Sequence, residues 1–464
     1  MRANKGVLLA ATLLGLSACS MAPDYHPPEL AAAPAYREGG PWQTAGANVP
    51  PAGKWWQIFA DPALDALEDR IEAGSPSLAA AVARYDQSLA IVRRSRADLL
   101  PDVQLGANVE RDRLSAARPL SQGRAVTYTN TQIGGSLSYE LDLFGRIRNT
   151  VKANQANAQA SASDVAGVRL GLQARLASVY FDMRGLDARV VLLRQTVAAF
   201  QRAFDLTDAR HDGGIASGID VSRAQSQLAS AKAELDAVAA DRARDEHAIA
   251  VLLGENPSSF TVPAVDTLIG APAIPAALPS TLLERRPDIA AAERRVAAAN
   301  AQIGVTRAAL FPAISLGGAA GFEATGGDLL HRDNSFWALG PLSAALSIFD
   351  GGARRANIRI SRAQYDEAAA NYRETVLTAF REVEDDLATG RHLIDQERNQ
   401  SMAAAAAERT RDLAMTRYRD GAADFLEVTI AQTAALDAQR ALLVIRAQQL
   451  AVATDTVRAL GGLY

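Results

Sequence analysis

The chain has 464 residues, a formal net charge of −4 at pH 7 and a single cysteine. A mild net charge without a basic, aromatic-interleaved patch argues against nucleic acid as a partner, and a lone cysteine excludes an intramolecular disulfide or a Cys cluster for metal. Hydrophobic residues make up 48% of the chain and aromatic residues only 6%, so the composition suits closely packed helices better than a thick globular core.

Residues 1–18 have the pattern of a signal peptide. Arg2 and Lys5 precede an apolar run, 7–16, that is too short to span a bilayer. The run leads into Leu16-Ser17-Ala18-Cys19, which resembles the processing box of bacterial lipoproteins. This resemblance implies cleavage before Cys19 and lipidation of its thiol and new amino group, palmitate included.

Two further points bear on this lipid anchor. Residue 20 is Ser rather than the Asp that commonly retains lipoproteins in the inner membrane, so the outer membrane is favoured. An ordinary secretory signal followed by a chance cysteine is the alternative. No later segment is long and apolar enough for a membrane helix, so any spanning element is expected to be β.

A Pro-rich stretch follows the anchor and leads into helices. Residues 19–60 are expected to form an extended tether without regular structure. Asp61 is an N-cap followed by proline at the first helical position, which predicts a short helix over 62–73. A second helix is predicted from 76 to about 99, ending before Pro101.

Two segments of period two come next, at about 102–110 and 128–143. In the second, apolar residues from Ile133 to Leu143 alternate with polar or small residues. One apolar and one polar face suit a strand between lipid and water, although a half-buried strand of a soluble sheet shows the same alternation. The polar, Arg-bearing segment between the two strands suits a loop at the cell exterior.

The rest of the first repeat, 61–254, is a helical hairpin. A helical pattern runs from about 148 to 208, and about 60 residues at 1.5 Å each give a helix on the order of 90 Å long. A Gly-containing turn, the first tip, covers about 207–220, and a second helix is predicted over about 218–253. Residues 255–280 form a Pro-rich linker.

The whole plan then repeats over residues 281–461, which leaves 462–464 as a C-terminal tail. The second repeat has the following predicted elements: a helix at 282–310, strands at about 313–323 and 336–349, a helix at about 353–416, a second tip at about 416–427 and a helix to 459. Arg210 and Arg417, like Gly214 and Gly421, stand 207 positions apart. Such a constant offset indicates internal duplication.

The four strands set the expected assembly. Four strands cannot close a barrel by themselves, and free sheet edges inside a bilayer are prohibitive because lipid leaves the backbone groups unpaired. The strands must therefore close with those of other copies, and a trimer supplies twelve. The fold class predicted is an α+β membrane protein, built from a duplicated helix-strand-strand-long helix-helix unit, with long helices packed side by side into a tube.

The chain resembles the TolC-type outer membrane factors, specifically the NodT-like lipoprotein branch. The resemblance covers nearly all of the mature chain. It rests on the two tips and on the following clusters: 55–59 with 61–64, 140–146, 283–289, and 301–304 leading to Phe311-Pro312. It implies a trimeric 12-stranded outer-membrane β-barrel continued by a periplasmic α-helical tunnel. The implied partners are outer-membrane lipid, a periplasmic adaptor (membrane fusion) protein and an inner-membrane pump, often of the RND class.

No catalytic constellation is found in the sequence. The five histidines lie far apart, without acidic residues at metalloprotease spacing, and no Gly-rich phosphate loop follows a predicted strand. We therefore expect no enzyme activity, no cofactor and no metal.

Charged residues are concentrated in the two tips, and the resemblance implies that they form a gate. In a trimer each inward carboxylate occurs three times and forms a ring; a solvated hairpin end is the alternative. The predicted periplasmic gate comprises Arg417, Tyr418, Arg419, Asp420, Asp424, Glu427 and Asp220. The predicted adaptor contacts are Arg210, Gly214, Ser217 and Gly421.

The function predicted is a passive exit duct of a tripartite efflux or secretion complex, as in multidrug efflux. It would open at its periplasmic tips when docked to the adaptor and the pump. The alternatives are a stand-alone porin, which would not need 60-residue helices, and a periplasmic helical-hairpin adaptor, which would lack the paired amphipathic strands and the duplication.

Overall fold

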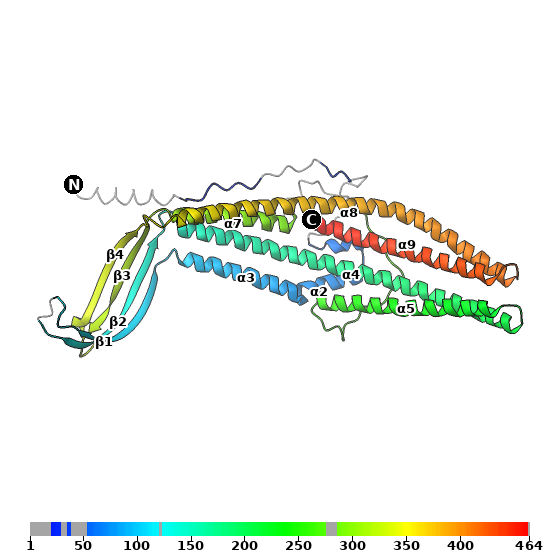
Figure 1. The fold of residues 1–464 in the computed structure, drawn as a ribbon, viewed down its shortest axis with the longest axis horizontal. Helices are drawn as coiled ribbons and strands as arrows, with labels where there is room; N and C mark the ends of the chain where they lie inside the picture. Colours follow the sequence, from blue (N-terminus) through cyan, green and yellow to red (C-terminus); the bar gives the residue numbers. More distant parts are fainter. Residues whose placement is uncertain (1–19, 29–34, 39–52, 120–122, 275–284, 463–464) are drawn as a thin grey trace. The chain divides into compact units, whose positions relative to one another are not determined.

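The computed structural model describes residues 20–28, 35–38, 53–119, 123–274 and 285–462. The predicted signal peptide 1–18 and the predicted lipid anchor Cys19 lie outside them. The chain forms two compact units (Figure 1). The strand unit comprises Met1–Glu29, Arg84–Ala162 and Ala291–Arg373, and the hairpin unit comprises Leu30–Ala83, Ser163–Ala290 and Glu374–Tyr464.

The elements follow the duplicated order expected from the sequence. The first half contains η2 (Trp55–Phe59), α2 (Pro62–Gly74), α3 (Pro76–Ala97), β1 (Asp102–Leu114), β2 (Val126–Leu141), α4 (Arg146–Asp212) and α5 (Gly218–Leu252). The second contains α7 (Pro287–Ala308), β3 (Ala313–Ala324), η3 (Arg332–Asn334), β4 (Ser335–Ala345), α8 (Ala353–Arg419) and α9 (Phe425–Ala459).

The duplication is visible in the lengths of the long helices. Both α4 and α8 have 67 residues, and both α5 and α9 have 35. Each bound in the first pair shifts by 207 positions to give the bound in the second. At 1.5 Å per residue α4 and α8 are about 100 Å long. Both exceed their predicted lengths, because helical hydrogen bonds continue into the Gly-containing turns.

The four strands form one antiparallel sheet in the order β1-β2-β3-β4 (Figure 1). Strands form at all four places where the alternation predicts them. The prediction that the last strand reaches residue 349 is wrong, since β4 ends at Ala345. Its neighbour β3 begins only after Pro312, and its first residue, Ala313, pairs with Ala345. Residues 346–349 therefore have no partner strand in the described sheet.

The sheet is tightest where two glycines face each other. Gly134 in β2 lies opposite Gly321 in β3. A Cβ atom added to Gly321 would stand 2.3 Å from the carbonyl oxygen of Ile133. No side chain fits there, so both positions require glycine for the strands to approach this closely.

The starts of α7 and α3 both fall at a proline. Residues 282–284 of the helix predicted from 282 lie outside the described residues, and α7 begins at Pro287, at a first helical position where a missing N–H group costs no hydrogen bond. The predicted helix 76–99 begins at Pro76 as expected but ends at Ala97.

The junction between strands and helices is fixed by capping carboxylates. Asp142 accepts hydrogen bonds from the backbone N–H groups of Ile147 and Arg148, at 3.0 and 2.8 Å, and so begins α4. Asp350 accepts from the backbone N–H of Arg354 at 3.2 Å in the equivalent place before α8. Each carboxylate also pairs with the guanidinium of the same arginine.

Aromatic residues before α2 form much of the core of the hairpin unit. Phe59 packs on Phe181 of α4 with ring centroids 4.6 Å apart, and Trp55 donates its indole N–H to Gln173 at 3.3 Å. Asp61 caps α2, as predicted, and also accepts a 2.7 Å hydrogen bond from the hydroxyl of Tyr180. The segment that precedes the first helix is therefore held against α4.

Within the described part of the chain, no helix is both long and apolar enough to cross a membrane.

Candidate functional site

The first tip is a glycine-terminated turn between α4 and α5. The N–H groups of Gly213 and Gly214 donate to the carbonyls of Ala209 and His211, at 3.1 and 2.8 Å. The N–H of Ile215 then donates to the carbonyl of Arg210 at 2.8 Å. Gly214 has φ of +72°, a backbone conformation that favours glycine. This residue ends the long helix and reverses the chain.

The second tip is the same turn, 207 residues later. The N–H groups of Asp420 and Gly421 donate to the carbonyls of Thr416 and Tyr418, both at 3.0 Å. Gly421 has φ of +78°, and the N–H of Ala422 donates to the carbonyl of Arg417 at 2.8 Å. The two copies share these three backbone hydrogen bonds, and their main differences lie in the side chains.

Each tip ends in an N-cap that begins the return helix. Ser217 forms a capping box with Asp220: its hydroxyl donates to the carboxylate at 2.7 Å and accepts from the Asp220 N–H at 3.2 Å. Asp424 occupies the equivalent position and accepts from the backbone N–H of Glu427 at 3.0 Å. The side chains of Ser217, Asp220 and Asp424 therefore hold the local turns together.

Arg210 joins the first tip to the second. Its guanidinium donates to the backbone carbonyls of Tyr418 and Arg419, both at 2.8 Å. The same group lies over the ring of Tyr418, with its central carbon 4.5 Å from the ring centroid. A planar guanidinium with several donors can make both contacts at once. We call this set of contacts the Arg210 clamp.

An apolar cluster lies beneath the clamp. Tyr418 is 5% exposed and contacts Phe425 edge to face, with ring centroids 5.4 Å apart. Its hydroxyl forms a 3.1 Å hydrogen bond with the hydroxyl of Thr207 in α4. The cluster draws on both hairpins and comprises Ala203, Ala224, Tyr418, Phe425 and Val428, with Phe204, Leu206 and Met415 packed against it.

The charged side chains of the remaining gate residues predicted in the second tip pair within their own hairpin. Arg417 pairs with Glu427 at 2.6 Å, and both side chains are largely exposed. Arg419 and Asp420 form a looser, exposed pair at 3.7 Å. Both pairs link side chains of the second tip to each other, whereas the first tip contacts the ring and carbonyl of Tyr418 and the carbonyl of Arg419.

The predicted adaptor contacts divide in the same way. Gly214, Ser217 and Gly421 are exposed, as an adaptor contact requires. Arg210 is only partly exposed, and its guanidinium is engaged by the second tip. The first tip also presents two apolar side chains that sequence reasoning did not single out: Ile215 is 79% exposed and Ile219 64%.

Two residues of the clamp region were not identified from the sequence. Thr207 and Phe425 pack around Tyr418, yet neither carries a charge that marks it in a polar turn. Spacing offered a signal, because Ala203, Thr207 and Arg210 lie at i, i+4 and i+7 and share one face of α4. That face is the one turned to the second hairpin.

A buried carboxyl group with a raised pKa, which the sequence did not reveal, lies on α8. Burial, and then the neighbouring carboxylate of Asp455, raise the pKa of Asp386 to about 7, although Arg458 opposes the shift. One of its carboxylate oxygens has no hydrogen-bond partner among the described residues. In the first hairpin burial likewise raises the pKa of Asp182 and of Asp245. Among the described residues, no group of three or more His, Cys, Asp or Glu side chains could hold a metal ion.

Comparison with known proteins identifies the family that shares this sequence and fold. The family model described as "Outer membrane efflux protein" matches residues 67–255 and residues 278–462, one stretch in each repeat. The probable efflux pump outer membrane protein TtgC of Pseudomonas putida is 33% identical over 458 residues, which cover 98% of this chain and 94% of the relative. Outer membrane protein OprJ of Pseudomonas aeruginosa is 33% identical over 464 residues, covering 98% and 95%.

Solved structures show the same similarity. The outer-membrane channel OprN superposes with a TM-score of 0.89 at 31% identity, over 96% of this chain and 99% of that one. The open state of the MtrE outer membrane channel of Neisseria gonorrhoeae gives 0.83 at 27% identity, over 96% and 98%.

These matches confirm the predicted family, the α+β fold class, the outer-membrane location and the role as an efflux duct. The family is one of efflux channels and not of enzymes. The roles assigned to single tip residues and to Cys19 stay predictions. With one match in each repeat and relatives aligned along almost its whole length, the chain belongs to the outer membrane efflux protein family.

Proposed function

We propose that three copies of the chain form the outer-membrane exit duct of a tripartite efflux system. A 12-stranded barrel would cross the membrane, and the helices would continue it as a periplasmic tunnel. A periplasmic adaptor and an inner-membrane pump, of the RND class, would complete the system and supply the energy. Relatives named as outer membrane proteins of efflux pumps support this proposal.

The observation that carries the proposal is the pair of free edges on the sheet. In the order β1-β2-β3-β4, the outer strands β1 and β4 each have one neighbour among the described strands. Both present large apolar side chains: Leu105 of β1 is 83% exposed and Trp337 of β4 is 81% exposed. Free edges are costly inside a bilayer because lipid leaves their backbone groups unpaired, whereas exposed apolar side chains are costly in water but not in lipid. Pairing of β1 with β4 of another copy would satisfy the edges, and lipid would cover the apolar side chains.

The Arg210 clamp supports a gate at the tips. The guanidinium of Arg210 and the cluster around Tyr418 tie the two hairpins of one chain together. For one hairpin to move away from the other, both hydrogen bonds and the contact with the ring must break. We therefore move Arg210 from the adaptor-facing set to the gate and retain Tyr418 there.

The exposed part of the first tip suits the adaptor. Gly214 and Ser217 are exposed beside Ile215 and Ile219, and most of the surface of these two apolar side chains is left uncovered by the described chain. Apolar side chains projecting from a polar turn are typical of a protein contact. Docking there would place the adaptor against the hairpin that holds the clamp.

The proposed lipid anchor is Cys19, which directly precedes Ser20, the first described residue. The hydroxyl of Ser20 donates to the side-chain oxygen of Asn149 at 2.9 Å. Asn149 lies in the first turn of α4, directly after the strand β2. A lipid on Cys19 would therefore emerge where the helices meet the strands that we place in the membrane.

The oligomer and the duct can be tested together. Full-length protein from outer-membrane fractions should run as a heat-modifiable trimer and form channels in planar bilayers. In cells that lack their own exit duct, its expression should restore multidrug efflux only when a matching adaptor and pump are present. A monomer without conductance would overturn the proposal, and efflux restored without adaptor or pump would support a stand-alone porin.

A further inference from the structure

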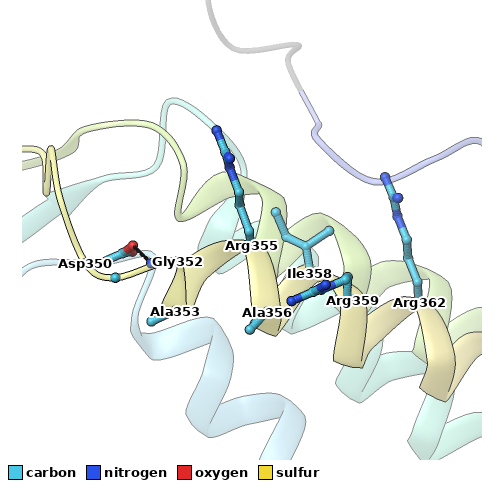
Figure 2. Close-up of a pocket in the computed structure, with 9 residues that line it drawn as sticks. Asp350, Gly352, Ala353, Arg355, Ala356, Ile358, Arg359 and Arg362 are labelled. Atoms are coloured by element: carbon cyan, nitrogen blue, oxygen red, sulfur yellow. Dashed lines mark hydrogen bonds between the residues drawn. The ribbon is translucent and has the colours of Figure 1, made fainter.

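Three arginines form an exposed stripe at the start of α8. Arg355, Arg359 and Arg362 stand at i, i+4 and i+7, which places them on one face over two helical turns. All three side chains are exposed. Figure 2 shows Arg355 and Arg362 projecting from α8 on the same side. We call these residues the arginine stripe.

The stripe borders an open hollow of about 700 Å³. Its lining residues are Asp350, Gly351, Gly352, Ala353, Arg355, Ala356, Ile358, Arg359 and Arg362. The single carboxylate in this set, that of Asp350, already pairs with Arg354 at 2.7 Å (Figure 2 shows its further hydrogen bond to Gly352). Among the described residues, none forms an ion pair with an arginine of the stripe. The hollow therefore presents uncompensated positive charge.

Apolar residues stand directly before the stripe. Ile348 is 94% exposed and Phe349 is 90% exposed, and both follow the end of β4 at Ala345. Such side chains are costly in water but stable in the interfacial region of a bilayer. An apolar stretch followed within about four helical turns by three cations has the order of groups met on leaving a membrane. This order places the stripe at the level of the lipid headgroups.

Contacts of the N-terminal segment independently support a position of the stripe at the level of the lipid headgroups. Ala22 lies against Gly304 in α7, where an added Cβ would come within 2.7 Å of its side chain. Thr306, two residues on, shares a 2.8 Å hydrogen bond with Ser361, the residue before Arg362. Ala22, which is close in sequence to the proposed lipid anchor, therefore contacts α7 at Gly304. Two residues further along, at Thr306, α7 contacts α8 beside the stripe.

In the proposed trimer, a neighbouring copy would not neutralise the stripe. The free edges β1 and β4 would pair between copies, and the helices joined to these strands are α3 and α8. The last turns of α3 contain Arg93, Arg94 and Arg96, so they are also basic. Two like-charged helix ends meeting at a subunit boundary repel each other unless anions lie between them. This favours lipid over protein as the occupant.

We propose that Arg355, Arg359 and Arg362 bind the phosphate groups of anionic phospholipids in the periplasmic leaflet of the outer membrane. Guanidinium groups bind phosphate oxygens through paired N–H donors, and a basic cluster beside a membrane segment attracts anionic headgroups. The inference rests on the proposed trimer in the outer membrane. Bound lipid would fix the depth of the barrel and neutralise the basic helix ends.

Native mass spectrometry of the full-length protein in detergent tests this. The protein is given equal amounts of phosphatidylglycerol and phosphatidylcholine with identical acyl chains, and the lipids retained per oligomer are counted. The triple substitution Arg355→Gln, Arg359→Gln and Arg362→Gln should lower phosphatidylglycerol retention at least about tenfold. Phosphatidylcholine retention should not change. The control is Arg381→Gln, Arg398→Gln and Arg409→Gln, three exposed arginines further along α8, which should behave as the wild type.

Equal phosphatidylglycerol retention by the two triple variants would overturn the inference. Loss of the oligomer in the first triple variant alone would also overturn it, and would assign the stripe to an interface between copies. Absence of a trimer in the wild type would instead contradict the proposed function. As a second measurement, 1 M salt shortens the Debye length from about 10 to about 3 Å, so the wild type should lose its preference for phosphatidylglycerol. A preference that survives 1 M salt would contradict binding through the stripe.

Discussion

The two tips have one backbone and two sets of contacts. The same three turn hydrogen bonds close each tip, and a glycine with positive φ, Gly214 or Gly421, ends each long helix. The second tip, however, has Tyr418 and Phe425 where the first has His211 and Gly218. The aromatic pair is buried between the hairpins, whereas His211 is exposed and forms a hydrogen bond with the carbonyl of Ala216 in its own turn. The two copies therefore share the turn, but the second copy alone of the two has aromatic residues at these two positions, and both lie in the cluster between the hairpins.

The arginines at equivalent positions show the same divergence. Arg210 and Arg417 are 207 residues apart. Arg210 reaches across to the second tip, but Arg417 pairs with Glu427 of its own return helix. One guanidinium therefore couples two hairpins, while its counterpart stabilises one. This asymmetry is the basis of the gate that we propose.

Replacing the buried tyrosine should have the largest effect. Tyr418→Ala removes an aromatic ring from the apolar cluster, and we expect a loss of about 3 kcal/mol in local stability. Hydrogen exchange of the tip amides should accelerate accordingly. The matched control is His211→Ala at the equivalent exposed position, for which we expect less than about 0.5 kcal/mol. Similar losses at both positions would show that the tips are energetically equivalent.

A conservative change separates the ring from its hydroxyl. Tyr418→Phe keeps the ring beneath Arg210 and removes only the hydrogen bond with Thr207. We expect about 1 kcal/mol, well below the effect of Tyr418→Ala. A loss as large as that of the alanine variant would mean that the hydroxyl, and not ring packing, holds the hairpins together.

The long helices should differ in their response to pH. Asp386 in α8 stands where α4 has the buried apolar residue Val179. Its pKa is raised to about 7, so the folded state prefers the neutral carboxyl. The resulting stabilisation is present below pH 4 and is lost as the pH rises through 7. Asp386→Asn should therefore raise the apparent Tm of the protein at pH 8 but not at pH 4.

The expected gain at pH 8 is about 2 kcal/mol, roughly half the full linkage value because the carboxyl is partly exposed to solvent. Asp455, Arg458, Glu382 and Asp385 surround the group and remain in the variant. If the wild type and Asp386→Asn had parallel Tm profiles from pH 4 to 8, Asp386 would not be the group that titrates.

Removal of either helix cap should have an effect as small as that of Tyr418→Phe, and the two caps should be interchangeable. Ser217→Ala and Asp424→Ala each remove an N-cap, at a cost of about 1 kcal/mol. Asp424→Ser gives the second tip the cap of the first and should restore most of that loss in thermal unfolding. If Asp424→Ser were as damaging as Asp424→Ala, the carboxylate would have a role beyond capping.

Much of the fold could be predicted because it depends on local patterns. The period-two strands and the capping Asp61 need only neighbouring residues to be recognised, and the 207-residue offset needs only a comparison of the sequence with itself. The end of β4 could not be predicted, since residues 346–349 continue the apolar pattern while the partner strand begins only at Ala313. Strand length is decided by the neighbour, and sequence alone does not show where the neighbour begins.

The sequence predicted where the candidate site lies but not which of its side chains contact each other. Charge and glycine spacing located both tips, yet Arg210 was assigned to the adaptor and separated from Tyr418. Their contact joins residues 208 positions apart, and no local pattern indicates which hairpin face meets which. The uncharged partners Thr207 and Phe425 were missed for the same reason.

Single-channel conductance in planar bilayers tests the clamp most directly, with Arg210→Gln compared to Arg417→Gln. Both substitutions remove one guanidinium from equivalent positions of the same turn, but only Arg210 joins the two hairpins. We predict a severalfold rise in conductance for Arg210→Gln and wild-type conductance for Arg417→Gln. Unchanged conductance in Arg210→Gln, or an equal rise in both variants, would contradict the Arg210 clamp as the contact that holds the duct closed.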